Sequence, residues 1–196
     1  RGEAASVNLI TQALHQANAE LCRYSQQHLD GHTAGSTVVV LLLDKVHYHF
    51  LWAGDSRGYL LRHQQLRQLT RDHSQVNDMV EQGLLSSSEA EQHELANVIT
   101  RAVGVDPSLS IDVISGVWQP GDLFLLCSDG LNKELSDDEI YQYLAHSNIA
   151  EANRALLHST LVAGARDNVT CILVKVDSST DIVNEKDKTI PVYLKI

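Results

Sequence analysis

Short runs of apolar residues, separated by turn residues, mark most of the chain after its first thirty positions. Residues 46–53 alternate between large apolar and smaller or polar side chains, which is the period of a β-strand. Residues 36–43 are almost wholly β-branched or leucine and predict a strand buried on both faces, and residues 123–127 predict another buried strand. Further strands are predicted at 59–62, 66–70, 98–103, 110–117 and 169–176. The short turns between them favour antiparallel pairing, so the pattern predicts an α+β fold rather than a doubly wound parallel sheet.

Helical periodicity appears first at residues 2–28, which predict one long amphipathic helix. Its apolar face consists of Ile10, Ala13, Leu14, Ala17, Leu21 and Tyr24. Shorter helices are predicted at 74–82, 84–95 and 149–163, and one more begins at Ser136. Ser86 with Glu89, and Ser136 with Glu139, have the spacing of capping boxes.

The division into domains follows from the same pattern. Residues 1–176 are expected to form one domain, from which the polar segment 84–95 protrudes. Residues 177–196 are expected to be a linker or tail. Its last part, 189–196, is strand-like, and Pro191 limits that strand to a sheet edge.

Composition narrows the classes of partner and the compartment. The formal net charge of −10 argues against nucleic acid and anionic membrane as partners. The three cysteines, with no CxxC pair among them, are expected to be reduced thiols. No apolar run approaches the length of a membrane span and no signal-peptide pattern is present, so we expect a cytoplasmic protein.

Three aspartates share one kind of position in the predicted structure. Asp55 and Asp129 each follow a strand, and Asp167 immediately precedes one. Strand ends meet at the edges of sheets, and carboxylates are the ligands that Mg²⁺ and Mn²⁺ prefer. Aspartate is also common at strand ends because it suits turns. The residues alone therefore indicate a candidate oxygen-ligand metal site and leave the turn interpretation open.

Other polar residues allow two interpretations each. His47 and His49 share one face of a predicted strand, where a half-solvated face is favoured over a metal site because no third ligand lies nearby in sequence. Arg57 suits a phosphate contact or, as we favour, an ion pair with a nearby aspartate. His73 is expected to have a structural role.

Six short motifs occur along the chain in an order that resembles the motif series of a known family. The motifs are Gly35-Ser36-Thr37, Ala53-Gly54-Asp55-Ser56-Arg57, Leu69-Thr70-Arg71-Asp72-His73, Ile99-Thr100-Arg101-Ala102-Val103-Gly104, the segment from Asp122 to Leu131 that contains Ser128-Asp129-Gly130, and Asp167-Asn168-Val169-Thr170. In this order, over about residues 2–176, the chain resembles the metal-dependent (type 2C) Ser/Thr protein phosphatases, in particular the bacterial type.

The resemblance implies a fold and a reaction. The fold is a β-sandwich of two antiparallel sheets flanked by helix pairs, in four layers α-β-β-α. The reaction is hydrolysis of phosphoserine and phosphothreonine in proteins by a water molecule bound to Mn²⁺ or Mg²⁺, with two to three ions in an intact site. Asp129 and Asp167 match ligands of the second metal, and Asp55 with Asp129 matches the pair that holds a third. Residues 84–97 match the family's flap beside the site. A phosphoprotein substrate and a cognate Ser/Thr kinase are the implied partners.

The resemblance also implies an incomplete site. Arg1 aligns directly after the family's metal-bridging Asp-Gly motif, so the bridging Asp, the general-acid His, the phosphate-binding Arg and the first strands have no counterpart. We therefore expect little or no phosphatase activity from this polypeptide alone. We also expect strand-mediated pairing of 189–196 with an open sheet edge, in the same chain or a second copy. The alternatives are a non-catalytic phosphatase-like module that binds or regulates a phosphoprotein, and a structural cation-binding domain.

Overall fold

The computed structural model describes residues 3–91, 93–146 and 148–177. The chain forms two compact units. The first comprises Arg1–Gly58 and Gln68–Val117, and the second comprises Tyr59–Arg67 and Trp118–Ile196. Each unit contains its own helices and strands.

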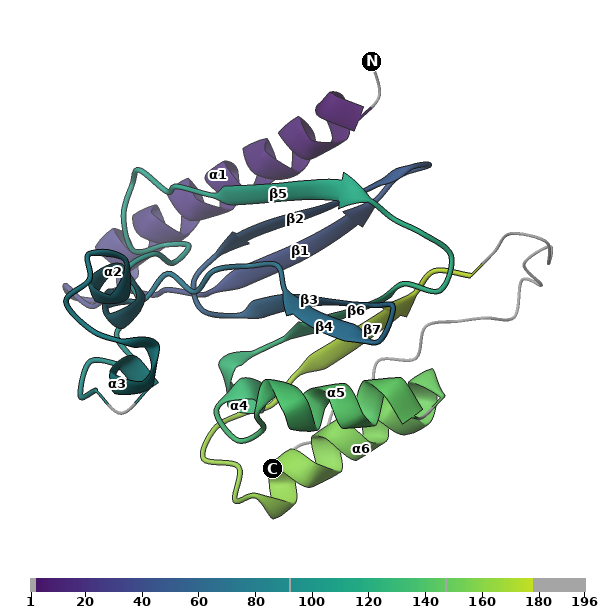
Figure 1. The fold of residues 1–196 in the computed structure, drawn as a ribbon. Coiled ribbons are helices and arrows are strands. Elements are labelled where there is room, and N and C mark those ends of the chain that lie inside the picture. The colour runs from purple at the N-terminus through teal and green to yellow at the C-terminus, as the bar shows by residue number, and fades with distance from the viewer. Residues whose placement is uncertain (1–2, 92, 147, 178–196) are drawn as a thin grey trace. The chain divides into compact units, whose positions relative to one another are not determined.

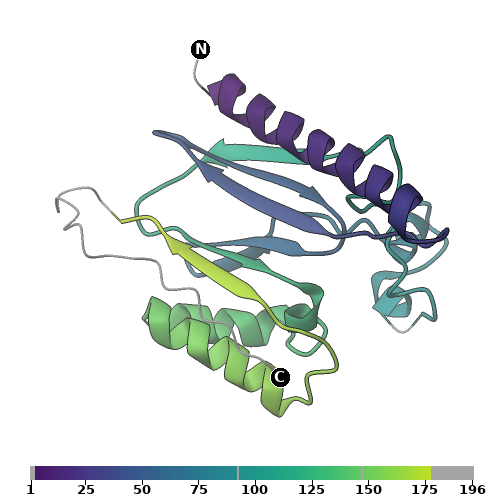
Figure 2. The same cartoon turned by 180° about the vertical axis from the view of Figure 1, so that it is seen from behind.

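The first unit is built on a three-stranded antiparallel sheet in the order β1-β2-β5. Its strands are β1 (Val38–Leu43), β2 (His47–Ala53) and β5 (Asp112–Val117). Val38 pairs with Ala53 and Leu43 pairs with Tyr48, so the β1–β2 hairpin is in register along its whole length. Helix α1 (Glu3–His28) runs across one face of this sheet, as Figures 1 and 2 both show.

Burial in this sheet differs from the expectation. Strand β2 lies in the centre of the sheet, and every one of its residues after His47 is buried. Strand β1, expected to be buried on both faces, is an edge strand whose residues are only half-buried, with Leu43 exposed. Position in the sheet therefore decides burial here rather than apolar content, because the central β2 contains two histidines and is still more buried than the wholly apolar edge strand β1.

The rest of the first unit is short helices and loops. Helix α2 (Gln75–Glu81) begins at the predicted cap, where Ser74 accepts a hydrogen bond from the Asn77 amide. Helix α3 (Ser87–Glu91) is shorter than expected, but the Ser86 amide donates to Glu89 at 2.8 Å as a capping box requires. The predicted strand at 98–103 is wrong, because this segment forms only isolated bridges, through Ile99 and Val103.

Helix α1 packs through a face that only partly coincides with the one that its apolar spacing indicated, since Ile10, Leu14 and Leu21 are half-buried. Its buried side chains are the polar Asn18 and Ser25, whereas Tyr24 is 52% exposed. Asn18 Nδ2 donates to the Asp106 carbonyl at 2.8 Å, and Asn18 Oδ1 accepts from the Gly104 amide at 2.7 Å. These bonds satisfy loop groups that burial would otherwise leave without a partner.

The second unit contains a four-stranded sheet in the order β4-β3-β6-β7. Strand β3 (Arg57–Arg62) begins in the first unit and continues into the second, and β4 (Gln65–Gln68) follows it in the predicted hairpin. His63 and Gln64 both have positive φ, at 49° and 60°, as a two-residue turn of type I′ requires. Strand β6 (Leu123–Cys127) is buried along its whole length, as predicted.

Strand β7 (Cys171–Lys175) pairs antiparallel with β6 and forms an edge of the sheet. Its expected complete burial is wrong, because Ile172 is 52% exposed. The β6–β7 pair nevertheless determines the site, because it sets the loop before β7 beside the end of β6.

Three helices complete the second unit: α4 (Asp129–Asn132), α5 (Asp137–His146) and α6 (Ile149–Val162). Helices α5 and α6 lie side by side over one face of the four-stranded sheet in Figures 1 and 2. The predicted Ser136–Glu139 box is present, and Leu135 and Ile140 pack in the same core. That core consists of Tyr59, Leu123, Leu125, Cys127, Leu131, Leu135, Ile140, Leu144, Ala152 and Leu156.

The α+β class with two antiparallel sheets and helices is confirmed. The predicted edge strand at 189–196 lies outside the described residues. None of the described helices combines the length and apolar character that crossing a membrane requires. The division at residue 176 and the flap at 84–97 stay predictions.

Candidate metal centre

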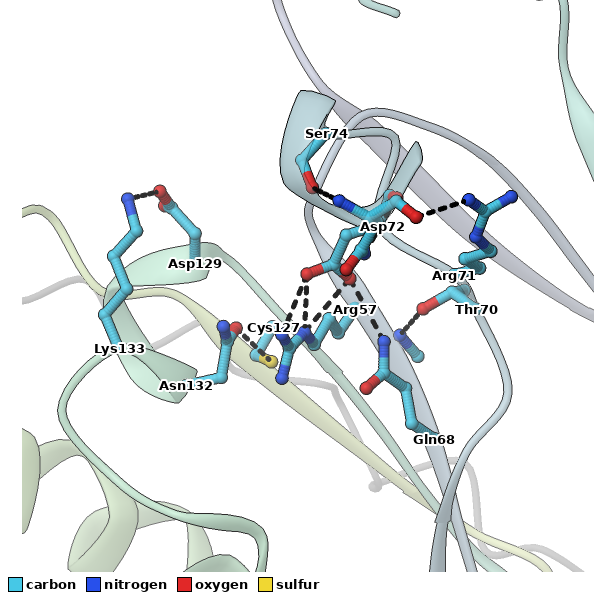
Figure 3. Close-up of polar contacts among 12 residues, drawn as sticks. Arg57, Gln68, Thr70, Arg71, Asp72, Ser74, Cys127, Asp129, Asn132 and Lys133 are labelled. Carbon is cyan, nitrogen blue, oxygen red and sulfur yellow. Dashed lines mark hydrogen bonds and ion pairs between the residues drawn. The ribbon is translucent and has the colours of Figure 1, made fainter. Parts of the chain in front are cut away.

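Asp129 lies where the buried strand β6 turns into helix α4. Ser128 is the N-cap, with extended backbone, and Asp129 is the first helical residue. Its side chain is 24% exposed, and its Oδ2 pairs with the Lys133 ammonium at 2.5 Å, as Figure 3 shows. The strand thus ends at the surface, and the carboxylate already faces a positive charge.

The loop before β7 carries Asp167 and is tied to this strand end. Ser128 N donates to the Thr170 carbonyl at 3.0 Å, and Thr170 N donates to Ser128 Oγ at 3.0 Å. Ser128 Oγ also donates to the Asn168 carbonyl at 3.3 Å. Asp167 Oδ1 accepts from the Asn168 amide at 2.7 Å, which orients the exposed carboxylate.

Gly130 is necessary for this arrangement. A β-carbon at this position would collide with the Asn168 carbonyl oxygen and press on Val169. Any larger residue would push the loop away from α4. The structure therefore brings the backbone segments of Asp129 and Asp167 together, and their role as metal ligands stays a prediction.

The carboxylates of Asp129 and Asp167 are suitable ligands for a hard cation, but there are only two of them. Mg²⁺ is commonly held by one or two carboxylates, with water filling the remaining positions. Asp129 and Asp167 provide such a pair of oxygen donors on adjoining segments. Within the described ranges, no cluster of three or more His, Cys, Asp or Glu side chains could hold a metal ion.

Asp55 belongs to the first unit and follows strand β2. It lies in a tight turn in which Gly54 has φ 118°, and a β-carbon on Gly54 would collide with Thr37. Thr37 Oγ1 and Ser56 Oγ are 3.0 Å apart. Asp129 and Asp167 lie in the other unit, so the sharing of a metal between Asp55 and Asp129 stays a prediction.

Arg57 forms the ion pair that the sequence favoured over a phosphate contact. Its Nε and Nη2 donate to Asp72 at 2.8–3.0 Å, and Gln68 Nε2 donates to the same carboxylate at 3.0 Å (Figure 3). Gly58 N donates to Thr70 Oγ1 at 2.9 Å. The segment 68–72 therefore holds Arg57 and Gly58, the residues on the C-terminal side of the turn that carries Asp55.

Sequence reasoning missed Lys133 as a partner of Asp129. The signal was present, because residues four apart on a helix are neighbours and Lys133 follows Asp129 by four. Helix α4 was not predicted, since its four residues are too few to show a helical period.

The histidine pair on β2 has a structural environment. His49 is 8% exposed, with Nδ1 2.7 Å from Ser115 Oγ and Nε2 3.3 Å from Asp44 Oδ2. Asp44 also accepts amide hydrogen bonds from Val46 and His47, so it organises the β1–β2 turn. The half-solvated face favoured from the sequence applies to His47 but not to the buried His49.

The cysteines are all free thiols, as expected. Cys171 on β7 donates to Asn153 Oδ1 at 3.0 Å. Burial raises the pKa of its thiol to about 11. Cys171 is therefore a poor nucleophile and a poor metal ligand in the folded state.

Comparison with known proteins decides the family. The pattern of the family described as Protein phosphatase 2C matches residues 1–164. The chain belongs to the protein phosphatase 2C family. The resemblance drawn from the motif series is thereby confirmed, and the enzyme class is that of a protein phosphatase.

Individual relatives agree with this assignment. The serine/threonine phosphatase stp of Listeria monocytogenes is 32% identical over 169 residues, which is 86% of this chain and 67% of that protein. The structure of PppA from Pseudomonas aeruginosa matches with a TM-score of 0.80 at 38% identity, covering 88% of this chain and 70% of that one. The catalytic domain of PstP, solved with two manganese ions, matches with a TM-score of 0.73 at 31% identity, covering 82% and 67%. The chain therefore spans about two thirds of each of these relatives.

Proposed function

We propose that the chain is the metal-binding part of a metal-dependent phosphatase that removes phosphate from phosphoserine and phosphothreonine in proteins. Its relatives are named as serine/threonine phosphatases, and one of the matching structures holds manganese. The observation that carries the proposal is the linkage of the Asp129 and Asp167 segments through Ser128, Asn168 and Thr170. Phosphoprotein substrates follow from the relatives' names, and a cognate kinase stays a prediction.

In this proposal Asp129 and Asp167 hold Mn²⁺ or Mg²⁺ through their carboxylate oxygens. A bound cation of this kind polarises phosphoryl oxygens and lowers the pKa of coordinated water towards neutrality. The protein's contribution is to present both carboxylates in fixed directions, through the Ser128–Thr170 pairing and the Asn168 amide bond to Asp167. Lys133 balances the charge of Asp129 and must release Oδ2 before a cation can bind that oxygen.

Asp55 is proposed as a ligand of a further cation. Supporting this assignment, its turn is braced from both sides, by the Arg57–Asp72 ion pair and by His73. An outer set of hydrogen bonds of this kind is typical of residues that orient metal ligands.

The chain on its own is proposed to be weakly active at most. The described residues offer no cluster of three metal ligands, and two-metal positioning needs more donors than Asp129 and Asp167 provide. The same observation favours the second candidate, a non-catalytic module that binds phosphoproteins. The two candidates differ in whether hydrolysis appears when further ligands are supplied.

The test uses Mn²⁺ titration calorimetry together with hydrolysis of p-nitrophenyl phosphate and a phosphothreonine peptide. The 196-residue chain should bind Mn²⁺ with very slow turnover, whereas a form extended at its N-terminus by a relative's Asp-Gly segment should gain Mn²⁺-dependent hydrolysis. Asp129→Asn and Asp167→Asn should each weaken Mn²⁺ binding, whereas Asp138→Asn, an exposed acid on α5, should not. Equal Mn²⁺ binding by the unchanged 196-residue chain and its three variants would refute the proposed site. Phosphopeptide binding without hydrolysis by the extended form would favour the non-catalytic module.

A further inference from the structure

His73 contacts the turn that carries Asp55, although it is distant from Asp55 in sequence. We propose that His73 is a positioning residue for Asp55: it fixes the backbone of Gly54 and thereby sets the direction in which the chain presents the Asp55 carboxylate. We call the pair of hydrogen bonds between His73 and Gly54 the clamp. The effect of the clamp on metal binding rests on the proposed role of Asp55 as a ligand, whereas the existence of the clamp does not depend on that role.

Two hydrogen bonds join His73 to Gly54. The His73 amide donates to the Gly54 carbonyl at 2.9 Å, and the Gly54 amide donates to His73 Nδ1 at 3.1 Å. These groups belong to the two peptide units on either side of the Gly54 α-carbon. Together the bonds therefore restrain both φ and ψ of Gly54, whose φ of 118° is accessible mainly to glycine. The restrained peptide on the C-terminal side includes the nitrogen of Asp55.

The imidazole ring can make this contact in only one neutral form. A backbone amide is always a donor, so Nδ1 must be unprotonated and Nε2 must carry the hydrogen. Nε2 lies 3.1 Å from Asp112 Oδ2, which accepts that hydrogen. Arg101 Nη1 donates to the other oxygen of Asp112 at 2.7 Å and so holds the carboxylate in place.

The ring is also fixed by packing. His73 is 3% exposed and stacks on Trp52, with ring centroids 5.9 Å apart and ring planes 10° from parallel. Trp52 Nε1 donates in turn to the Arg71 carbonyl at 2.8 Å. Asp112, Trp52 and the backbone thus leave the ring one orientation, in which Nδ1 faces Gly54.

Two substitutions separate the clamp from simple packing. In His73→Asn the amide oxygen stands close to the place of Nδ1, so the Gly54 amide keeps an acceptor and the contact with Asp112 is lost. In His73→Gln the amide reaches the place of Nε2, so the contact with Asp112 is kept and the Gly54 amide loses its acceptor. If His73 only filled space, the smaller asparagine would be the more damaging change.

The first measurement is hydrogen exchange of the Gly54 amide by NMR in the full chain without metal. The proposal expects exchange at least about tenfold faster in His73→Gln than in His73→Asn, because the amide of the former has no partner. Equal exchange in the two variants, or faster exchange in the asparagine variant, would overturn the clamp whatever the role of Asp55.

The second measurement is Mn²⁺ affinity in a double-mutant cycle with Asp55→Asn. His73→Gln should weaken the Asp55-dependent binding by about tenfold, the usual effect of removing a residue that orients a ligand. In the Asp55→Asn background it should have no further effect. An equal effect in both backgrounds would overturn positioning through Asp55. If Asp55→Asn alone leaves Mn²⁺ binding unchanged, the proposed ligand role of Asp55 fails, and the exchange data alone decide the clamp.

Discussion

The Asn168 carbonyl oxygen occupies the space that a side chain at Gly130 would need. This approach sets the loop of Asp167 against the first turn of α4, where Asp129 lies. The pairing of two candidate metal ligands therefore depends on a glycine that touches neither carboxylate.

Gly130→Ala should destabilise the protein by about 2 kcal/mol, because the β-carbon meets a backbone oxygen that cannot rotate away. Urea unfolding measures the change. Gly83→Ala is the matched control, since its β-carbon meets nothing and only its φ of 71° adds strain, of about 1 kcal/mol. Equal losses in the two variants would contradict the close approach.

Arg62→Ala should cost more stability than its surface position suggests. Arg62 donates to both oxygens of Asp122, at 2.7 and 2.6 Å, and the Asp122 side chain is only 1% exposed. Removing the guanidinium leaves a buried carboxylate without its counter-ion, at a cost of about 3 kcal/mol. Lys175→Ala, which breaks an exposed pair with Asp177, should change stability by less than about 0.5 kcal/mol in the same unfolding experiment. A small effect at Arg62 would mean that water or another donor satisfies Asp122.

Stability should fall as the pH drops below about 6.5. Burial lowers the pKa of His73 below its ordinary value of 6.5, and the hydrogen bond to Asp112 offsets only part of that effect. At a pH between the pKa of His73 in the folded chain and its pKa in the unfolded chain, the unfolded chain binds a proton that the folded chain does not. The free energy of unfolding therefore falls with pH until the pH is below the folded-state pKa. Unfolding free energies at pH 7.5, 6.5 and 5.5 measure the slope. His73→Asn, which cannot titrate, should show a shallower decline, and identical slopes would contradict the assignment.

Cys171 should resist alkylation. With a thiol pKa of about 11, the thiolate fraction at pH 8.5 is about a hundredfold lower than that of a free cysteine. Peptide mapping after iodoacetamide treatment should show Cys171 modified about a hundredfold more slowly than glutathione under the same conditions. Denaturation in urea should remove the difference, and rapid modification of the folded chain would show that β7 opens readily.

Lys133→Met should strengthen Mn²⁺ binding about twofold, because the ammonium and the cation compete for Asp129 Oδ2 and an exposed pair of this kind contributes about 0.5 kcal/mol. Lys133→Arg keeps the competing charge and is the control. Isothermal titration calorimetry measures both variants. Weaker binding in the methionine variant would show that Lys133 supports the cation instead of competing with it.

Much of the fold was accessible from the sequence because local signals agree with the final structure. The capping boxes at Ser86 and Ser136 both form, and the five apolar residues of β6 are all buried. The His63–Gln64 turn joins β3 and β4 where the pattern placed a hairpin. In each case the residues that determine the structure are neighbours in the chain.

The wrong predictions concern which strands lie at the edges of the sheets and whether the segment 98–103 is a strand. The edge positions of β1 and β7 depend on which strands lie beside them, and apolar composition does not contain that information. The segment 98–103 has the apolar content of a strand but finds partners only through isolated bridges to Ser36 and Ser74.

For the candidate site, the sequence placed Asp129 after a strand and Asp167 before one, as the structure has them. The segments of Asp129 and Asp167 adjoin because β6 and β7 are paired, and the strand pattern predicted both strands but not their pairing. The Lys133 pair, the Asn168 approach to Gly130 and the His73 clamp depend on side-chain geometry across segments. His73 and Gly54 come into contact only when the chain has folded.

The buried Asn18 of α1 has a consequence for the order in which the first unit folds. An amide side chain gains nothing from nonspecific collapse, and its three contacts lie 86 to 89 residues away in the chain. We therefore expect α1 to dock only after the loop that contains Gly104 and Asp106 has reached its native shape. Helix α1 is synthesised before that loop but would then be among the last parts of its unit to acquire stable contacts.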